Sequence, residues 1–306
     1  MMITAVGACA PPGISEITQE SAKVRDRAME KNRELRIFAE EIRVATLKEF
    51  AHLGFGHVGG AMSVVELLAV LYGKEMKYDP KNPKMDDRDK LVMSKGHAGP
   101  ALYATLALKG FFPEEMLYTL NQGGTNLPSH CDRNKTPGVD MTTGSLGQGI
   151  STACGLALGD RLMGRDSTTY LVLGDGECNE GQIWEGAMFA AHYKLDNLIG
   201  FVDLNKQQLD GACDQVLYMG DMVDKFTAFG WHVQKVDGHN VDAVAEAITN
   251  AKAAAGKPSM IILDTVKGHG CPMAESMFPC HHIAFKAEDF APSLQHAEEV
   301  LAALKQ

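Results

Sequence analysis

The feature that most constrains the fold is an alternation of short apolar runs and helical patterns in the second half of the chain. The apolar runs cover residues 170–173, 198–202, 231–236 and 259–264. Largely continuous apolar runs of this length indicate strands buried on both faces, which is typical of parallel strands covered by helices. The sequence therefore predicts an α/β fold with a three-layer, doubly wound and mostly parallel sheet.

Helical patterns accompany these predicted strands. Ser63 is predicted to cap a helix, with Glu66 as its capping-box partner. Residues 121–143, rich in Gly, Pro, Asn and Thr, are expected to form a long loop, and loops of this length in compact domains are usually functional or disordered. Residues 1–14 are interpreted as a flexible arm and 15–306 as one domain. Helices are expected at 15–52, 64–72, 98–109, 147–163, 221–229 and 241–255, with one more ending at 192 and a short strand at 91–93.

Composition and charge exclude several classes of protein. The 306 residues include 39 acids and 29 bases, and a net charge of −10 disfavours nucleic acids and anionic membranes as partners. No apolar run reaches the length of a membrane span. The 7 cysteines are scattered without a CxxC pair, so neither a disulfide framework nor a zinc knuckle is expected, and a reducing cytoplasm is the predicted compartment.

An acid and an amide follow two of the predicted strands. Asp175 stands in the sequence Gly174-Asp175-Gly176 after the first strand, and Asn205 follows the second. Oxygen ligands at the ends of neighbouring parallel strands suit a hard cation such as Mg²⁺ or Ca²⁺, which can hold a diphosphate. Both segments are also common turn formers, but their position after two buried strands favours a cation site.

Several histidines stand beside glycines or as a pair in predicted loops. They are His57 in GHVGG, His97 in SKGHA, His130 in PSH, His269 in KGHG, and the pair His281-His282. Imidazoles in loops at strand ends suit a site that donates hydrogen bonds to phosphate and moves protons near neutral pH. The histidines lack the spacing of zinc ligands, so we do not predict that they bind a metal.

Two further features carry a functional and a simpler interpretation. The segment 142–150, TTGSLGQGI, is either a glycine-led helix N-terminus or a backbone surface that a flat ring can approach closely. Glu180 and Glu185 lie on the helix after Gly176. Exposed acids are the default there, whereas in a buried interface they would need partners or protons.

Taken in order, these motifs resemble the N-terminal, thiamine diphosphate-binding half of transketolase. GHVGG, SKGHA, the His130 segment, TTGSLGQGIS, GDG followed about thirty residues later by Asn, and the closing HH occur in the family's order. The resemblance covers nearly the whole chain, from the helix before His57 to His282. It implies a thiamine diphosphate-binding fold and the transfer of a two-carbon ketol unit from a ketose to an aldose.

The resemblance also implies a cofactor site. The metal ligands would be Asp175, Asn205 and the main-chain carbonyl of Gln207. The diphosphate would meet Gly176, Asn205, His97 and one of His281 and His282, and Gly174 would also belong to the cofactor site. The backbone of Gly144 and Leu146 would meet the aminopyrimidine ring.

Catalytic roles follow from the same resemblance. The sugar would face His57, His130 and one of His281 and His282. Glu180 resembles the buried interface acid that links the two cofactors of a dimer, with Glu185 in the same network.

A partner is implied as well, because a full transketolase continues beyond the point that corresponds to Gln306. The continuation includes a pyrimidine-binding domain with the glutamate that activates the cofactor. The resemblance therefore implies the first subunit of a split transketolase that is active only with a C-terminal subunit. The expected assembly is a heterotetramer.

Some positions depart from the family pattern and leave the sugar open. Ser145 stands where many relatives have Pro, Ile283 stands where Gly is usual, and 271–278 matches poorly. Pentose phosphates are the default substrates, and a sulfo-sugar or a branched-sugar phosphate is the alternative. A related decarboxylating thiamine enzyme and a non-catalytic paralogue are the other interpretations.

Overall fold

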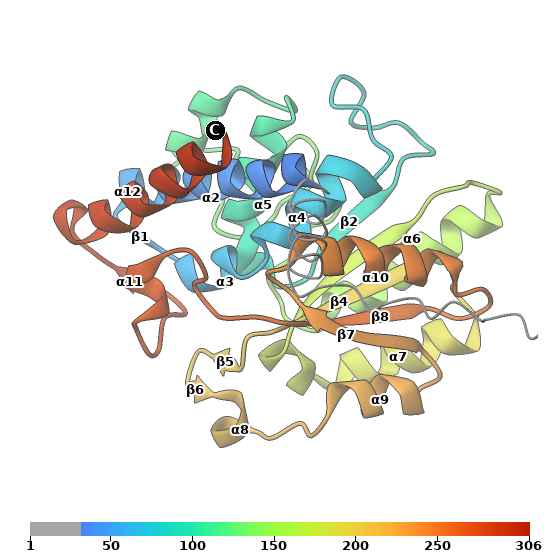
Figure 1. Ribbon diagram of the computed structural model, residues 1–306. Helices are drawn as coiled ribbons and strands as arrows, with labels where there is room; N and C mark the ends of the chain where they lie inside the picture. The colour runs from blue at the N-terminus through green and yellow to red at the C-terminus, as the bar shows by residue number, and fades with distance from the viewer. Residues whose placement is uncertain (1–31) are drawn as a thin grey trace, which may run out of the picture. The chain divides into compact units, whose positions relative to one another are not determined.

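Figure 1 shows the computed structural model of the protein, which describes residues 32–306. The chain divides into two units, 1–33 and 34–306, and the strands lie in the second. The first described helix, α2 (Arg33–Leu53), corresponds to the second part of the helix predicted at 15–52. The predicted arm at 1–14 and the start of that helix lie outside the described residues.

The centre of the fold is a five-stranded sheet in which every neighbouring pair is parallel. Its order is β2 (Lys90–Met93), β3 (Thr169–Gly174), β4 (Leu198–Leu204), β8 (Ser259–Asp264) and β7 (His232–Asp237). All residues of β3 are buried, as its apolar run predicted. The expected parallel sheet is thus confirmed.

Helices cover both faces of this sheet and make the three predicted layers (Figure 1). On one face α6 (Gln148–Leu162), α7 (Gly181–His192) and α9 (Met222–Ala228) pack against alternate strand residues such as Leu171 and Val202. On the other face lie α2, α3 (Val58–Met62), α4 (Val65–Val70), α5 (Gly99–Leu108) and α10 (Val241–Ala253), packed against residues such as Val172 and Phe201. The alternation of side chains along each strand separates the two cores.

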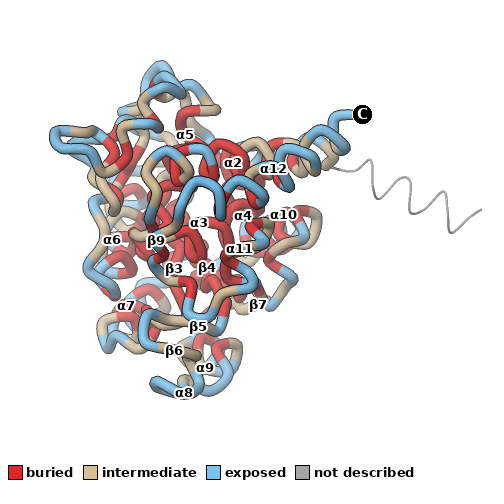
Figure 2. The backbone as a smooth tube through the Cα atoms, turned by 90° about the vertical axis from the view of Figure 1, so that its left-hand side faces the viewer, coloured by how far each residue is buried: buried red, intermediate tan, exposed pale blue. Residues whose placement is uncertain are grey.

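The remaining elements are short, apart from a C-terminal helix. A π-helical turn η1 (Leu71–Glu75) extends α4, and 3₁₀ turns are η2 (Gly96–Ala98), η3 (Glu114–Thr119) and η4 (Gly176–Asn179). Small pairs are β1 (Phe55–Gly56) with β9 (Ile283–Ala284), and β5 (Gln207–Gln208) with β6 (Gly211–Ala212). The last helices are α8 (Cys213–Val216), α11 (Pro272–Glu275) and α12 (Ala287–Leu304). Figure 2 shows the buried backbone concentrated in β3, β4, α3 and α4.

The predicted capping box at Ser63 and Glu66 is wrong. The helical segment is divided into α3 and α4, and no side chain caps α4. Ser63 is buried, and its Oγ donates to Asp203 Oδ2 at 2.7 Å. Glu66 is also buried, and it accepts a hydrogen bond from Arg43. Tertiary partners outcompete the local cap because buried polar side chains must be satisfied inside the fold.

The β1–β9 pair brings together segments that are far apart in sequence. Phe55 is paired with Ala284, and Gly56 with Ile283. This pairing places the loop that contains His57 beside the segment that contains His281 and His282. Within residues 32–306, no helix is long and apolar enough to cross a membrane.

Candidate cofactor site at the strand ends

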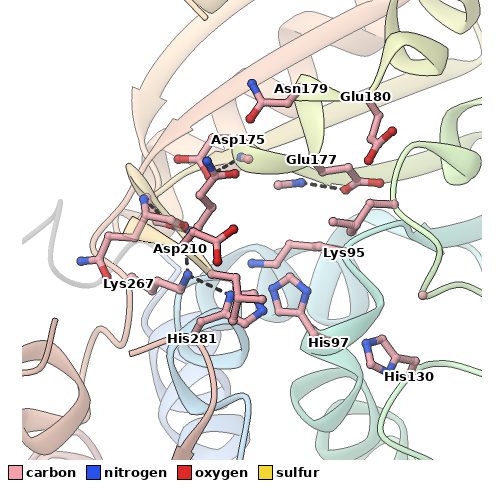
Figure 3. Close-up of a pocket in the computed structure, with 18 residues that line it drawn as sticks. Lys95, His97, His130, Asp175, Glu177, Asn179, Glu180, Asp210, Lys267 and His281 are labelled. Atoms are coloured by element: carbon pink, nitrogen blue, oxygen red, sulfur yellow. Dashed lines mark hydrogen bonds between the residues drawn. The ribbon is translucent and has the colours of Figure 1, made fainter. Parts of the chain in front are cut away.

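A pocket of about 360 Å³ lies beyond the carboxyl ends of β3 and β4 (Figure 3). That place is where open parallel sheets bind their ligands, and the volume is in the range of small-molecule sites. Most of the predicted site residues line it. They are His97, His130, Gly144, Leu146, Gly174, Asp175, Gly176, Glu180, Asn205, Gln207 and His281.

Asp175 is a buried acid whose charge is only partly compensated. Its Oδ1 accepts a hydrogen bond from Gly176 N at 2.7 Å, and its Oδ2 accepts one from Lys206 N. Burial, and then the charge of Asp203, raise the pKa of Asp175 to about 6. A carboxylate in this state is stabilised by a cation, because a positive charge would offset both effects.

Asn205 and Gln207 supply further oxygen atoms beside Asp175. Asn205 Nδ2 donates to Asp203 Oδ2 at 2.7 Å, and its Oδ1 accepts from Gln207 N at 3.1 Å. The main-chain oxygen of Gln207 accepts a hydrogen bond from Lys267 Nζ at 2.9 Å. A carbonyl oxygen has two lone pairs, so this contact leaves one of them free for a cation.

Asp203 and Lys95 form a buried ion pair that the sequence analysis did not single out. Lys95 also donates to Gly60 O at 2.8 Å, and Asp203 accepts from Thr265 as well as from Ser63. Burial opposes the ionisation of Asp203, yet Lys95 and the hydroxyl donors hold its pKa below the usual range. The sequence signal was an acid at the end of an apolar strand, which does not reveal its partner.

Five of the predicted histidines meet at one side of the pocket, although they come from four loops. His57 lies at the centre of this pocket cluster. Its ring centroid is 5.6 Å from that of His97, 5.5 Å from His130, 5.3 Å from His281 and 4.8 Å from His282. The rings of His97 and His281 are 4.7 Å apart. The structure therefore brings the predicted histidines together, with His269 as the exception.

The environment of the pocket cluster keeps most of its imidazoles neutral. Burial, followed by His282 and His130, lowers the pKa of His57 to about 4. Burial and Lys267 lower the pKa of His281 to about 3. The pKa of His97 is also well below the usual value because of burial and Lys95, and burial lowers that of His130. Neutral imidazoles can both donate and accept hydrogen bonds at neutral pH.

The two histidines of the closing pair occupy different positions. His281 lines the pocket, and its Nδ1 is 3.2 Å from Lys267 Nζ. His282 is exposed and packs against Phe55, with ring centroids 5.8 Å apart. Of the two, His281 is the one that faces the place predicted for the cofactor.

Glycines let the pocket walls approach one another closely. A Cβ added to Gly60 would lie 2.6 Å from the His97 ring, and one on Gly176 would lie 2.8 Å from Gln208 Cβ. Gly144 has a φ of 140°, which side-chain-bearing residues rarely adopt, and its Cβ would meet His130 at 3.3 Å. These positions explain why the motifs require glycine.

Glu177 is a buried acid of the pocket that the sequence analysis missed. It accepts hydrogen bonds from Gly147 N and Gly174 N, both at 3.0 Å, and from the Ser94 hydroxyl. It therefore joins the loop after β2, the start of α6 and the end of β3. Glu180 lines the pocket but is exposed in this chain, and Glu185 is also exposed.

The motif at 267–270 is split between two places. Lys267 lines the pocket, whereas His269 lies in a separate His239–His269 cluster that also contains Arg43, Glu66 and Glu275. The rings of His239 and His269 are stacked at 3.7 Å. The glycines beside His269 suggested a pocket residue, but His269 lies outside the pocket.

The match to known proteins covers the region that builds this site. The family model for the transketolase thiamine diphosphate-binding domain matches residues 35–297. The 6-deoxy-6-sulfo-D-fructose transketolase subunit SqwG of a Clostridium species is 52% identical, over 85% of this chain and 95% of its own length. An apulose-4-phosphate transketolase subunit of Phocaeicola vulgatus is 36% identical, over 82% of this chain and 89% of its own length.

Solved transketolase structures share the fold. The Pichia stipitis enzyme in complex with sedoheptulose-7-phosphate superposes with a TM-score of 0.78 at 28% identity, over 89% of this chain and 45% of that one. The Campylobacter jejuni enzyme gives a TM-score of 0.77 at 27% identity, over 89% of this chain and 48% of that one. This chain thus spans about half the length of these transketolases, and the predicted thiamine diphosphate-binding α/β fold is confirmed. The chain belongs to the transketolase family, within its N-terminal, thiamine diphosphate-binding domain.

Proposed function

We propose that this chain is the thiamine diphosphate-binding subunit of a two-subunit transketolase that moves a two-carbon ketol unit from a ketose to an aldose. The observation that carries the proposal is that the incompletely compensated Asp175 lines a pocket that has a cluster of five histidines at one side. The first feature suits a cation with a diphosphate, and the second suits sugar hydroxyls and proton transfer.

The residues of the pocket fit the cofactor. Asp175, Asn205 and the carbonyl of Gln207 would hold the cation, and three oxygen ligands of this kind suit Mg²⁺ completed by phosphate oxygens and water. Gly174, Gly176 and His97 would meet the diphosphate, and the two glycines have no side chain that would occupy its place. When bound, thiamine diphosphate supplies a site that stores the electrons released by carbon–carbon cleavage.

The ring of the cofactor would lie over the segment that contains Gly144 and Leu146. Leu146 is 41% exposed although it is a large apolar side chain, and it lines the pocket. An apolar side chain beside a bare glycine backbone offers a surface on which a flat ring can rest. Glu180 would lie at the interface with another chain, near the same ring.

The histidines would act on the sugar. His57, His130 and His281 are neutral at neutral pH and line or adjoin the pocket, so each can donate a hydrogen bond to a sugar hydroxyl, and His57 and His130 can also accept protons. His282 would form the outer side of the cluster through its contacts with His57 and Phe55. The related decarboxylating thiamine enzymes do not account for the histidine cluster as directly.

A second polypeptide is part of the proposal. Relatives that match over most of their length are named as subunits, and their names motivate a split enzyme. The partner would supply the pyrimidine-binding domain and the acid that activates the cofactor, and two copies of each chain would form a heterotetramer. The six described cysteines are all free, which supports assembly in a reducing cytoplasm.

The sugar is proposed from the relatives. The SqwG protein, named for 6-deoxy-6-sulfo-D-fructose, is 52% identical, and the protein named for apulose-4-phosphate is 36% identical. We therefore favour a ketose that carries a sulfonate over one that carries a phosphate. The partner subunit would supply most of the contacts with the end of such a sugar that is far from the reacting carbon atoms.

The test is cofactor binding and turnover by the chain co-expressed with a C-terminal transketolase subunit from the same organism. Calorimetry should detect thiamine diphosphate only when Mg²⁺ is present. The Asp175→Asn substitution should weaken thiamine diphosphate binding about 100-fold, which corresponds to about 2.7 kcal/mol of binding free energy. The reason is that a charged ligand of the cation is lost. Asp289→Asn, at an exposed position of α12, is the matched control and should bind normally.

A donor screen then decides the chemistry. Ketol transfer from 6-deoxy-6-sulfofructose should exceed that from xylulose 5-phosphate. Equal or greater use of phosphorylated ketoses would overturn the sulfonate assignment, and release of carbon dioxide from pyruvate without ketol transfer would overturn the transketolase assignment. Absence of cofactor binding by the pair would overturn the whole proposal.

A further inference from the structure

Lys267 and His281 form a close pair within the pocket. Lys267 is buried, with 3% of its surface exposed. Its Nζ is 2.9 Å from Gln207 O and 3.2 Å from His281 Nδ1 (Figure 3). The pair therefore links the carbonyl proposed as a metal ligand to the histidine that lines the pocket.

The chemistry of a lysine decides the direction of these hydrogen bonds. An ammonium group has three hydrogens and no lone pair, so it can only donate. Gln207 O can only accept, which agrees with Lys267 as the donor in the first contact. In the second contact Nδ1 of His281 must then present its lone pair. A neutral imidazole with a bare Nδ1 carries its hydrogen on Nε2.

We propose that Lys267 is a positioning residue that holds His281 in the neutral Nε2–H tautomer, so that His281 presents a fixed hydrogen-bond donor to the pocket. This inference deepens the proposed function and rests on it for its catalytic meaning. A second hydrogen on Nδ1 would point at the ammonium group and is therefore disfavoured. Among residues 32–306, none hydrogen-bonds to Nε2 of His281, which leaves that N–H for a ligand.

The fixed tautomer gives His281 and His57 different roles within the pocket cluster. His281 would hold an oxygen atom of the diphosphate or of the sugar, and it would not serve as a base, because its only lone pair is directed at Lys267. His57 lies at the centre of the cluster, and no described lysine hydrogen-bonds to its ring. Its two nitrogens can therefore exchange donor and acceptor roles, as proton transfer requires.

The test is nitrogen NMR of the complete chain labelled with ¹⁵N-histidine, recorded at pH 7.5 without cofactor. Two-bond ¹H–¹⁵N correlations distinguish the two neutral tautomers, and loss of one set of signals in His281→Asn assigns the residue. We expect the Nε2–H pattern in the wild-type protein. Lys267→Met should convert it to a mixture or to the Nδ1–H form, whereas Lys267→Arg, which keeps the donors, should retain it.

Lys286→Met is the matched control, since the Lys286 side chain is exposed and is not among the residues that line the pocket. It should leave the His281 signals unchanged. An Nδ1–H pattern in the wild-type protein would overturn the inference, as would an unchanged Nε2–H pattern in a folded Lys267→Met variant. An Nδ1–H pattern in the wild-type spectrum overturns the inference even if the methionine variant does not fold.

This measurement is independent of the proposed reaction. It requires neither thiamine diphosphate nor the partner subunit, so a failed tautomer prediction would leave cofactor binding untouched. Scanning calorimetry of the same variants distinguishes a positioning role of Lys267 from a purely structural role. If Lys267 only supported the fold, Lys267→Arg and Lys267→Met would shift the unfolding midpoint without any change in the His281 tautomer.

Discussion

The pocket cluster and the His239–His269 cluster contain similar residues but differ in how they are satisfied. In the His239–His269 cluster, His239 Nδ1 contacts Glu66 at 3.2 Å, and its Nε2 accepts from Val266 N at 2.8 Å. Arg43 takes the other oxygen of Glu66, and His269 Nδ1 contacts Glu275 at 3.1 Å. In the pocket cluster the histidines meet mainly through their ring faces and edges.

This difference distinguishes polar groups that are satisfied within the fold from polar groups that remain available to a ligand. The ligand atoms of Glu66, His239 and His269 lie within 4.8 Å of one another, close enough to hold a metal ion. Both oxygens of Glu66 and both nitrogens of His239 are already engaged, however, and the charge of Arg43 is adjacent. A cluster that satisfies itself stabilises the fold, whereas one with open nitrogens beside a pocket is available to a ligand.

The largest effect is expected from removing the imidazole of His57, which lies at the centre of the pocket cluster. His57→Ala should lower ketol transfer by the two-subunit enzyme about 10²–10⁴-fold, the usual contribution of a proton-transferring group. Steady-state kinetics with the preferred donor measures this change. His269→Ala is the matched variant in the other cluster, and its activity per folded molecule should stay within about twofold. Equal losses in the two variants would refute the division between the clusters.

The next effect concerns the stability provided by the His239–His269 cluster. Arg43→Met should lower the free energy of unfolding by about 3–5 kcal/mol, because it leaves Glu66 buried without its main positive partner. Urea denaturation of the isolated chain measures it. Lys48→Met removes the exposed pair with Glu298 and should cost less than about 1 kcal/mol. A small effect of Arg43→Met would show that this cluster does not stabilise the fold.

The smallest effect tests a buried acid that lies in neither cluster. Glu49 is fully buried, and no residue in the described part of the chain hydrogen-bonds to its carboxyl oxygens. Burial raises its pKa well above the usual value, so the folded state keeps a proton that the unfolded chain releases above about pH 4.3. Its contribution to stability is therefore present at low pH and is lost as the pH rises toward the folded-state pKa.

The Glu49→Met substitution should remove this loss of folding stability with rising pH. The variant should gain about 1–3 kcal/mol over the wild type at pH 8, and less at pH 4, because an unpaired buried acid is replaced by an apolar side chain. Denaturant unfolding at several pH values measures the difference. Glu288→Met, at an exposed position, should show no such pH dependence. A gain that is the same at both pH values would contradict the raised pKa of Glu49, because stability depends on pH only where a pKa differs between the folded and unfolded states.

Much of the fold was predictable because it depends on local patterns. The apolar run at 259–264 predicted β8 with its correct bounds, and the glycines after 173 predicted the turn at the end of β3. The capping box at Ser63 failed because both side chains have tertiary partners. No element was assigned to α12 or to the β1–β9 pair, and a two-residue pairing such as the latter leaves no periodic signal.

The candidate site, like the fold, was predictable from the sequence only in part. The sequence by itself determined which residue types end β3 and β4, and therefore where an oxygen-rich cation site is expected. Only the tertiary structure decided that Lys95 neutralises Asp203, whereas the charge of Asp175, which lines the pocket, is only partly compensated. It also decided that Lys267 rather than His269 enters the pocket, and that His281 rather than His282 faces it. The reason is that burial and charge pairing arise between segments distant in sequence, and no local pattern records them.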